Sequence, residues 1–332
     1  MASTPLNSIN LTQDQLAKWL IEDMPYRIQI ARIFPFMGIQ GGKISYARTP
    51  ALEAVADIND MATILGEGGT SGIAVQTADP AASNATFTLG ELATRYKIEY
   101  SSMDRFKYPN NLDAVESALA IRRLTYMFYR KLDLATTGNP GDFPSLSDMC
   151  AAGQRFNSAA APNAAARIDE LQKAYSLITS NNGRPNAIMC NSRAYRWIMA
   201  AYFGVGANPE YVPYEWTDPI KGRLTVQVAS INGTPIFIND MIATEDSDPE
   251  FYTRIYFMVL GDACESGPVR GITGIVPGPL KDTLFIRRES TEPASAHSTS
   301  LINVDYTFPV AIAMGSSGAL SILDQVDVAA YT

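Results

Sequence analysis

Histidine, the side chain best suited to moving protons near neutral pH, occurs once in this sequence, at His297. It lies in a run of Glu, Pro, Ala, Ser and Thr residues, a composition typical of a loop. A serine hydrolase would need a Gly-x-Ser-x-Gly turn, and residues 315–318 are one residue short of that pattern. We therefore interpret His297 as a loop residue and 315–318 as a turn, and we expect no catalytic residue.

Glycine-rich and acidic runs in the chain lack the spacing of ligand sites. Residues 66–72 are glycine-rich, but they do not join a predicted strand to a helix as a dinucleotide-binding loop does. Asp246, Asp248 and Glu250 lack the central glycine and the terminal glutamate of a calcium-binding loop. We expect a flexible loop and a solvated acidic turn, and we predict no bound cofactor or metal.

Composition and charge narrow the class of protein. With 46% hydrophobic and 18% charged residues, the chain has the composition of a folded protein. Its net charge of −8 disfavours a nucleic-acid-binding surface, which needs clustered Lys and Arg. Cys150, Cys190 and Cys264 are odd in number and widely spaced, so we interpret them as reduced thiols of a cytosolic protein. No run approaches the roughly 18 apolar residues of a membrane span, and no leader pattern opens the chain.

The first elements that the sequence predicts are an amphipathic stretch at 11–24 and then a long hairpin. Residues 43–48 and 86–100 alternate between apolar and polar side chains, as paired strands do. The tip between them, at about 56–84, is rich in small residues. Because a connection of this length is uncommon within one compact domain, we expect the hairpin to be ordered by a neighbouring subunit.

The strongest helical pattern runs from 110 to 135 and ends before Gly138 and Pro140. Residues at alternating spacings of four and three predict one buried stripe: Ala114, Ala118, Ile121, Thr125, Phe128 and Leu132. Four basic side chains lie along its sides: Arg122, Arg123, Arg130 and Lys131. We predict a long helix with one face packed against the rest of the protein.

The sequence after the long helix predicts a mixed α+β arrangement. A helix at 163–178, a buried strand at 187–190 and a helix from about 192 to 203 are followed mainly by strands. Asn232-Gly233 between two apolar runs indicates a hairpin turn. The predicted late strands lie at 224–229, 235–238, 255–260, 284–287, 302–307, 310–314 and 319–323.

Several segments carry a family resemblance. Residues 186–193 are similar to the strand-to-helix step of an axial domain, 231–240 to a Gly-x-Pro-Val hairpin, and 256–262 to a strand ending in Gly-Asp. Residues 301–323 resemble the strands that close a peripheral domain. With the order of the elements, these segments make the chain resemble the major capsid proteins of tailed phages, which have the Hong Kong ninety-seven fold.

The resemblance implies an α+β phage-capsid fold with five parts. These are an N-terminal arm (1–37), an extended hairpin loop (38–103), the spine helix of a peripheral domain (104–142), an axial domain (143–290) and the closing strands of the peripheral domain (291–332). It implies a structural, non-enzymatic protein, made in the bacterial cytoplasm, whose hexamers and pentamers form an icosahedral virion shell around double-stranded DNA. The sequence lacks a charged coiled-coil segment before the arm, so the further partners implied are a separate scaffolding protein, a portal and a decoration protein.

Two other functions remain open from the sequence. An encapsulin, a cellular nanocompartment, shares the same resemblance, and a packaged enzyme would distinguish it from a phage capsid. A cytosolic hydrolase with an unrecognised Ser or Asp site belongs to another class. Particle size separates the hydrolase from both shells, because a shell has a mass of megadaltons.

Charge complementarity suggests how subunits could be oriented. The hairpin carries four acidic residues: Glu53, Asp57, Asp60 and Glu67. We expect them to face the basic residues Arg122, Arg123, Arg130 and Lys131 of another subunit, because complementary charge fixes orientation. The alternative is that both sets are solvated faces, since exposed pairs contribute only about 0–1 kcal/mol.

Overall fold

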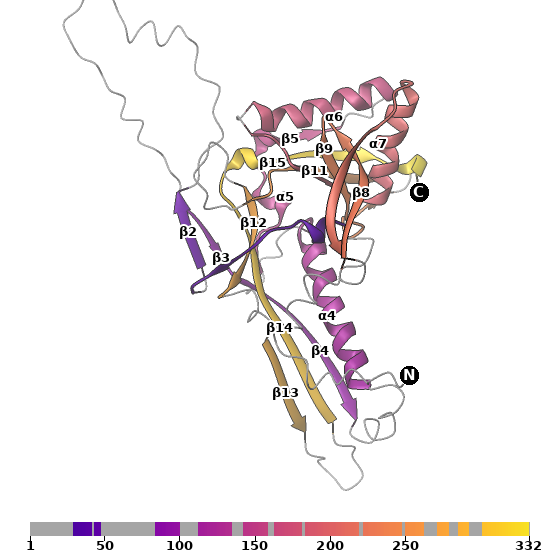
Figure 1. The fold of residues 1–332 in the computed structure, drawn as a ribbon. Coiled ribbons are helices and arrows are strands. Elements are labelled where there is room, and N and C mark those ends of the chain that lie inside the picture. The colour runs from indigo at the N-terminus through magenta and orange to yellow at the C-terminus, as the bar shows by residue number, and fades with distance from the viewer. Residues whose placement is uncertain are drawn as a thin grey trace, which may run out of the picture.

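The computed structural model describes the following residues: 29–41, 43–47, 84–99, 112–134, 142–158, 163–180, 183–218, 222–247, 250–261, 271–278, 285–291 and 301–331. Within these ranges the strands form a five-stranded, an eight-stranded and a two-stranded sheet. Figure 1 shows an elongated lobe built on the five-stranded sheet and a second lobe built on the eight-stranded sheet. No helix in the described part of the chain combines the length and apolar character needed to cross a bilayer.

The elongated lobe is organised by β14 (Leu301–Met314). Its first ten residues pair with β4 (Gly90–Glu99), its first seven with β13 (Phe285–Thr291), and its end with β12 (Ile272–Pro277). β1 (Phe36–Ile39) completes the sheet beside β12. The sequence predicts two strands, at 302–307 and 310–314, where the structure has one continuous strand.

The long helix α4 (Leu112–Lys131) packs against β4 and β14 (Figure 1). Ile121, Thr125, Phe128 and Leu132 are buried, which confirms the predicted stripe at these positions. The side chains of Ala114 and Ala118 lie outside the described residues. Nearer its start, Ser117 bonds the hydroxyls of two sheet tyrosines: Tyr96 at 3.0 Å and Tyr306 at 2.8 Å.

The second lobe contains eight strands and two helices. Seven strands follow the order β5 (Arg155–Asn157), β15 (Leu320–Asp327), β11 (Glu250–Met258), β6 (Ala187–Cys190), β9 (Thr234–Ile238), β8 (Gly222–Ile231) and β7 (Glu210–Asp218), and β10 (Glu245–Ser247) pairs with β11. The helices α6 (Ala164–Thr179) and α7 (Ser192–Gly204) pack against each other and against this sheet. Asn163 and Asn191 cap them through side-chain oxygens, which satisfy backbone N–H groups of the first turn.

The structure contains the base of the predicted long hairpin and the whole of the predicted Asn232-Gly233 turn. β2 (Lys43–Ala47) pairs with β3 (Asn84–Thr88), and β4 then leaves the hairpin to join β14 (Figure 1). The connection at 48–83 lies outside the described residues. The Asn232-Gly233 turn joins β8 to β9 with φ values of 51° and 76°, as a two-residue hairpin with two left-handed positions requires.

The sheets divide the chain differently from the expected parts. β12 and most of β13 fall within 143–290, the expected axial domain, but pair in the five-stranded sheet. β14 and β15 both fall within 291–332, the expected closing strands, yet β15 belongs to the eight-stranded sheet. The short 3-10 helix Ser317–Ala319 connects β14 to β15, so the chain passes from one lobe to the other within a few residues.

Candidate functional site

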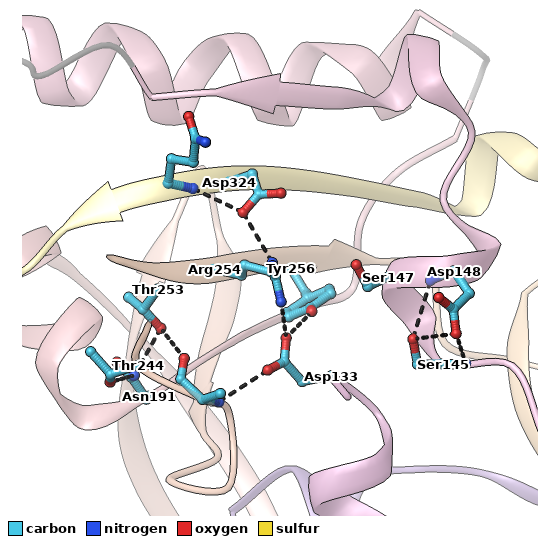
Figure 2. A network of polar contacts seen from close by, with 12 residues as sticks. Asp133, Ser145, Ser147, Asp148, Asn191, Thr244, Thr253, Arg254, Tyr256 and Asp324 are labelled. Carbon is cyan, nitrogen blue, oxygen red and sulfur yellow. Dashed lines mark hydrogen bonds and ion pairs between the residues drawn. The ribbon is translucent and has the colours of Figure 1, made fainter. Parts of the chain in front are cut away.

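A buried polar junction joins the end of α4 to the eight-stranded sheet. Asp133, two residues beyond α4, is 2% exposed and accepts a hydrogen bond from the backbone N–H of Ala243 at 3.0 Å. The same carboxylate accepts hydrogen bonds from the Tyr256 hydroxyl and, at 3.4 Å, from the Arg254 guanidinium. Figure 2 shows Arg254 and Tyr256, both on β11, converging on Asp133.

The network continues across the sheet through alternating charges. The Nε of Arg254 donates to Asp324 on β15 at 3.0 Å, and Arg155 on β5 donates to the same carboxylate at 3.1 Å. Arg155 also donates to the backbone oxygen of Ser147 at 2.7 Å. Ser147 lies in α5 (Leu146–Met149), a single turn closed by a capping box between Ser145 and Asp148. One polar chain thus ties the end of α4 to α5, β5, β11 and β15. Figure 2 shows its part from Asp133 through Arg254 to Asp324.

Burial controls the protonation of these groups. Burial, with Asp133 adding to it, raises the pKa of Tyr256 well above its ordinary value, so the hydroxyl remains a hydrogen-bond donor. Burial lowers the pKa of Arg254, but Tyr256, Asp133 and Asp324 together raise it by more, so the guanidinium stays charged. The arrangement holds two lobes in one orientation, because a buried carboxylate separated from its donors is costly.

The predicted basic set on α4 divides into two groups. Arg122, Arg123 and Arg130 are exposed. Lys131 is instead 7% exposed and forms an ion pair with Asp142 at 2.8 Å within its own chain. The predicted acidic partners Glu53, Asp57, Asp60 and Glu67 lie outside the described residues. The inter-subunit pairing of these sets stays a prediction.

Exposed apolar side chains mark two further surfaces that sequence reasoning missed. Leu119 and Met127 accompany Arg123 and Arg130 along one face of α4, at spacings of three and four residues, and the exposed Leu134 follows the helix. Phe203 near the end of α7, Val205 directly after it and Tyr211 at the start of β7 are 61%, 42% and 55% exposed. Periodicity on α4 marks this second stripe, but only the structure shows that nothing in the described chain covers it.

The structure describes only some of the groups considered for chemistry. His297, Cys264, Asp248 and residues 66–72 lie outside the described residues. Cys190 is buried, and burial raises the pKa of its thiol. Asp246 and Glu250 belong to the antiparallel pair β10–β11. Among the residues described, no three His, Cys, Asp or Glu side chains gather as metal ligands would.

Comparison with solved structures finds similarity to shell proteins that extends over 91% to 100% of this chain. The SrpI encapsulin of Synechococcus elongatus PCC 7942 matches with a TM-score of 0.62 and 15% identity, over 100% of this chain and 94% of that chain. The structure of Microbacterium phage Oxtober96 matches with a TM-score of 0.55 and 11% identity, over 98% and 96%. The capsid of an empty GTA particle matches with a TM-score of 0.54 and 15% identity, over 91% of each chain.

No protein-family model matches the sequence, and neither does any curated protein. At 11% to 15% identity the structural likeness establishes the fold. The chain has the α+β Hong Kong ninety-seven fold, and this confirms the fold expected from the sequence.

Proposed function

We propose that this chain is the major capsid protein of a tailed bacteriophage. The observation that supports the proposal is the likeness to shell subunits over 91% to 100% of the chain. The role is structural: copies of the chain associate in hexamers and pentamers and close an icosahedral head around double-stranded DNA. The protein is made in the host cytoplasm and resides in the virion.

The fold supplies a physical reason for assembly. Exposed apolar side chains on α4 and around the α7–β7 connection lose contact with water when another copy covers them. This burial stabilises the contact by about 25 cal/mol for each Å² of apolar surface removed from water. The Asp133 junction fixes the angle between the lobes, so the same contacts recur at the same angle in every subunit. Repeated contacts of this kind close into rings when their rotation permits closure.

The charge pairing predicted from the sequence is part of this proposal. Arg122, Arg123 and Arg130 are exposed on α4 and available to the acidic residues Glu53, Asp57, Asp60 and Glu67 of a neighbour. Lys131 contributes through its ion pair with Asp142 at the end of α4, which is an intramolecular role. A separate scaffolding protein, a portal and a decoration protein are the further partners proposed.

An encapsulin is the second candidate function, because the SrpI encapsulin matches with a TM-score of 0.62. The decisive experiment is sedimentation and negative-stain microscopy of the protein expressed alone and with candidate scaffolding protein. A phage capsid should form uniform megadalton shells only with the scaffold. Uniform shells formed alone around an enzyme cargo would favour the encapsulin, and a small oligomer under every condition would contradict both.

A further inference from the structure

A cavity of about 810 Å³ lies between the last turn of α4, the N-terminus of α7 and the segment after β9. Three arginines line it: Arg130 from α4, and Arg193 and Arg196 from α7. Its wall includes Met241 and Phe251, so a charged rim surrounds partly apolar surface. The cavity therefore draws its cations from both lobes.

Asp240, the one carboxylate among the described residues that line this cavity, is held by Ser192 in the cavity wall. Asp240 accepts hydrogen bonds from the backbone N–H of Ser192 at 2.9 Å and from the Ser192 hydroxyl at 2.5 Å. It thus offsets the positive N-terminal end of α7. Within the described part of the chain, neither Arg130 nor Arg193 forms an ion pair, and Arg193 lies 5.8 Å from the Phe251 ring. The cavity retains an excess of positive charge.

We propose that this cavity binds carboxylate side chains of a second copy of this chain and so anchors one subunit to the next. The inference rests on the proposed shell function, which brings copies together. A guanidinium presents paired N–H donors that match a carboxylate, and arginines from two elements can hold one or two such groups. The chain carries 34 acidic and 26 basic residues, so a second copy supplies more carboxylates than competing cations.

A carboxylate fits the cavity better than a nucleic-acid backbone does. A nucleic-acid backbone is bound by many cations spread along an extended groove. These three arginines instead line one pocket. Arg130 also lies on the exposed α4 face that carries Leu119 and Met127, so the cavity continues the surface proposed for contact between subunits. An occupant reaching both Arg130 and Arg193 would bridge the two lobes.

The first test is the double variant Arg130→Glu/Arg193→Glu. Its matched control is Lys173→Glu/Arg184→Glu, which changes the net charge equally at exposed positions on another surface. We expect the control to form shells as the unmodified chain does, and the cavity variant to lose at least tenfold in particle yield while its circular dichroism and melting stay unchanged. The variant Arg130→Lys/Arg193→Lys, which keeps the charge, should recover part of the yield.

A second measurement identifies the occupant. Benzoyl-phenylalanine introduced at Met241 should cross-link, in particles mixed from ¹⁴N and ¹⁵N subunits, to an acidic peptide of a different copy. Normal shells from the cavity variant, or cross-links only to nucleic acid or to another protein, would overturn the inference. Because shell formation by the unmodified chain tests the proposed function separately, failure of that function is distinguished from failure of this anchor.

Discussion

The hydroxyl of Tyr256 donates a hydrogen bond to the carboxylate of Asp133 although 123 residues separate them in the chain. Both side chains are buried, at 0% and 2% exposure. This contact fastens the end of α4 to the middle of β11, and with them the two lobes of the subunit (Figure 2). The orientation of one lobe on the other therefore combines these buried polar contacts with an apolar core that both lobes share.

Replacing Tyr256 by Phe should lower the free energy of unfolding by about 1–3 kcal/mol, because Asp133 loses a buried donor and retains its full desolvation cost. The measurement is urea denaturation of the unassembled chain. Tyr211→Phe is the matched control, since Tyr211 is 55% exposed. Equal stabilities for the two variants would contradict the role given to the junction.

Arg254→Met should destabilise the chain more, because it removes the cation shared by Asp133 and Asp324. We expect a loss of about 3 kcal/mol, the lower end of the range for breaking a buried pair, since Arg254 is partly exposed. Arg95→Met, which breaks the exposed pair with Asp305, should cost only about 0–1 kcal/mol. In the double variant Asp133→Asn/Arg254→Met, the decrease in the free energy of unfolding should be smaller than the sum of the decreases in the two single variants.

Reversing Arg122 and Arg123 to Glu should slow or misdirect shell assembly without changing the helical signal of the monomer. Both side chains are exposed on α4, and a weak contact repeated at every subunit acts collectively. The measurement is the rate of light scattering during assembly as a function of salt concentration. Normal shells with normal salt dependence would mean that shape and apolar burial alone place the hairpin.

Stability should fall in alkaline solution. Burial raises the pKa of Tyr129, Tyr256 and Cys190 in the folded chain above the ordinary values of 10.0 for tyrosine and 9.0 for cysteine. As the pH rises through these ordinary values, the unfolded chain releases protons that the folded chain retains, so the free energy of unfolding decreases. Each such group should contribute a slope of about 1.4 kcal/mol per pH unit once it titrates.

Urea denaturation at pH 7, 9, 10 and 11 measures this dependence. Stability should be constant up to about pH 8, because below the ordinary values both states bind the same protons. In Tyr256→Phe the decline above pH 10 should be shallower by the contribution of that one hydroxyl. A decline of the same steepness in both proteins would show that Tyr256 ionises without cost in the folded chain.

Local patterns in the sequence determined the elements that local physics can specify. The stripe at Ile121, Thr125, Phe128 and Leu132 follows from the helical repeat, and it is buried as predicted. The turn at Asn232-Gly233 follows from the tolerance of these two residues for left-handed backbone. The α+β class follows from the mixture of such elements, and the fold was expected from the resemblance of their order to that of phage capsid proteins.

The strand β7 shows where local patterns fail. Pro213 interrupts its apolar alternation, so the sequence does not predict a strand there. Among the described strands, β7 ends the strand order of its sheet and pairs on one side only, with β8. An edge strand tolerates a proline because one row of backbone groups needs no partner, and this depends on the position of the strand in the finished sheet.

The tertiary structure alone decided which distant groups meet. Local periodicity assigns β14 and β15 to strands but contains no information about the sheet each one joins. Lys131 has the sequence context of a solvated helix residue, but tertiary contacts bury it, among them the ion pair with Asp142 and the nearby Phe143 ring. Arg130 and Arg193 line one cavity because the end of α4 meets the segment after β9 beside the N-terminus of α7. Such encounters depend on burial and pairing energies summed over the whole chain, which no short window of residues encodes.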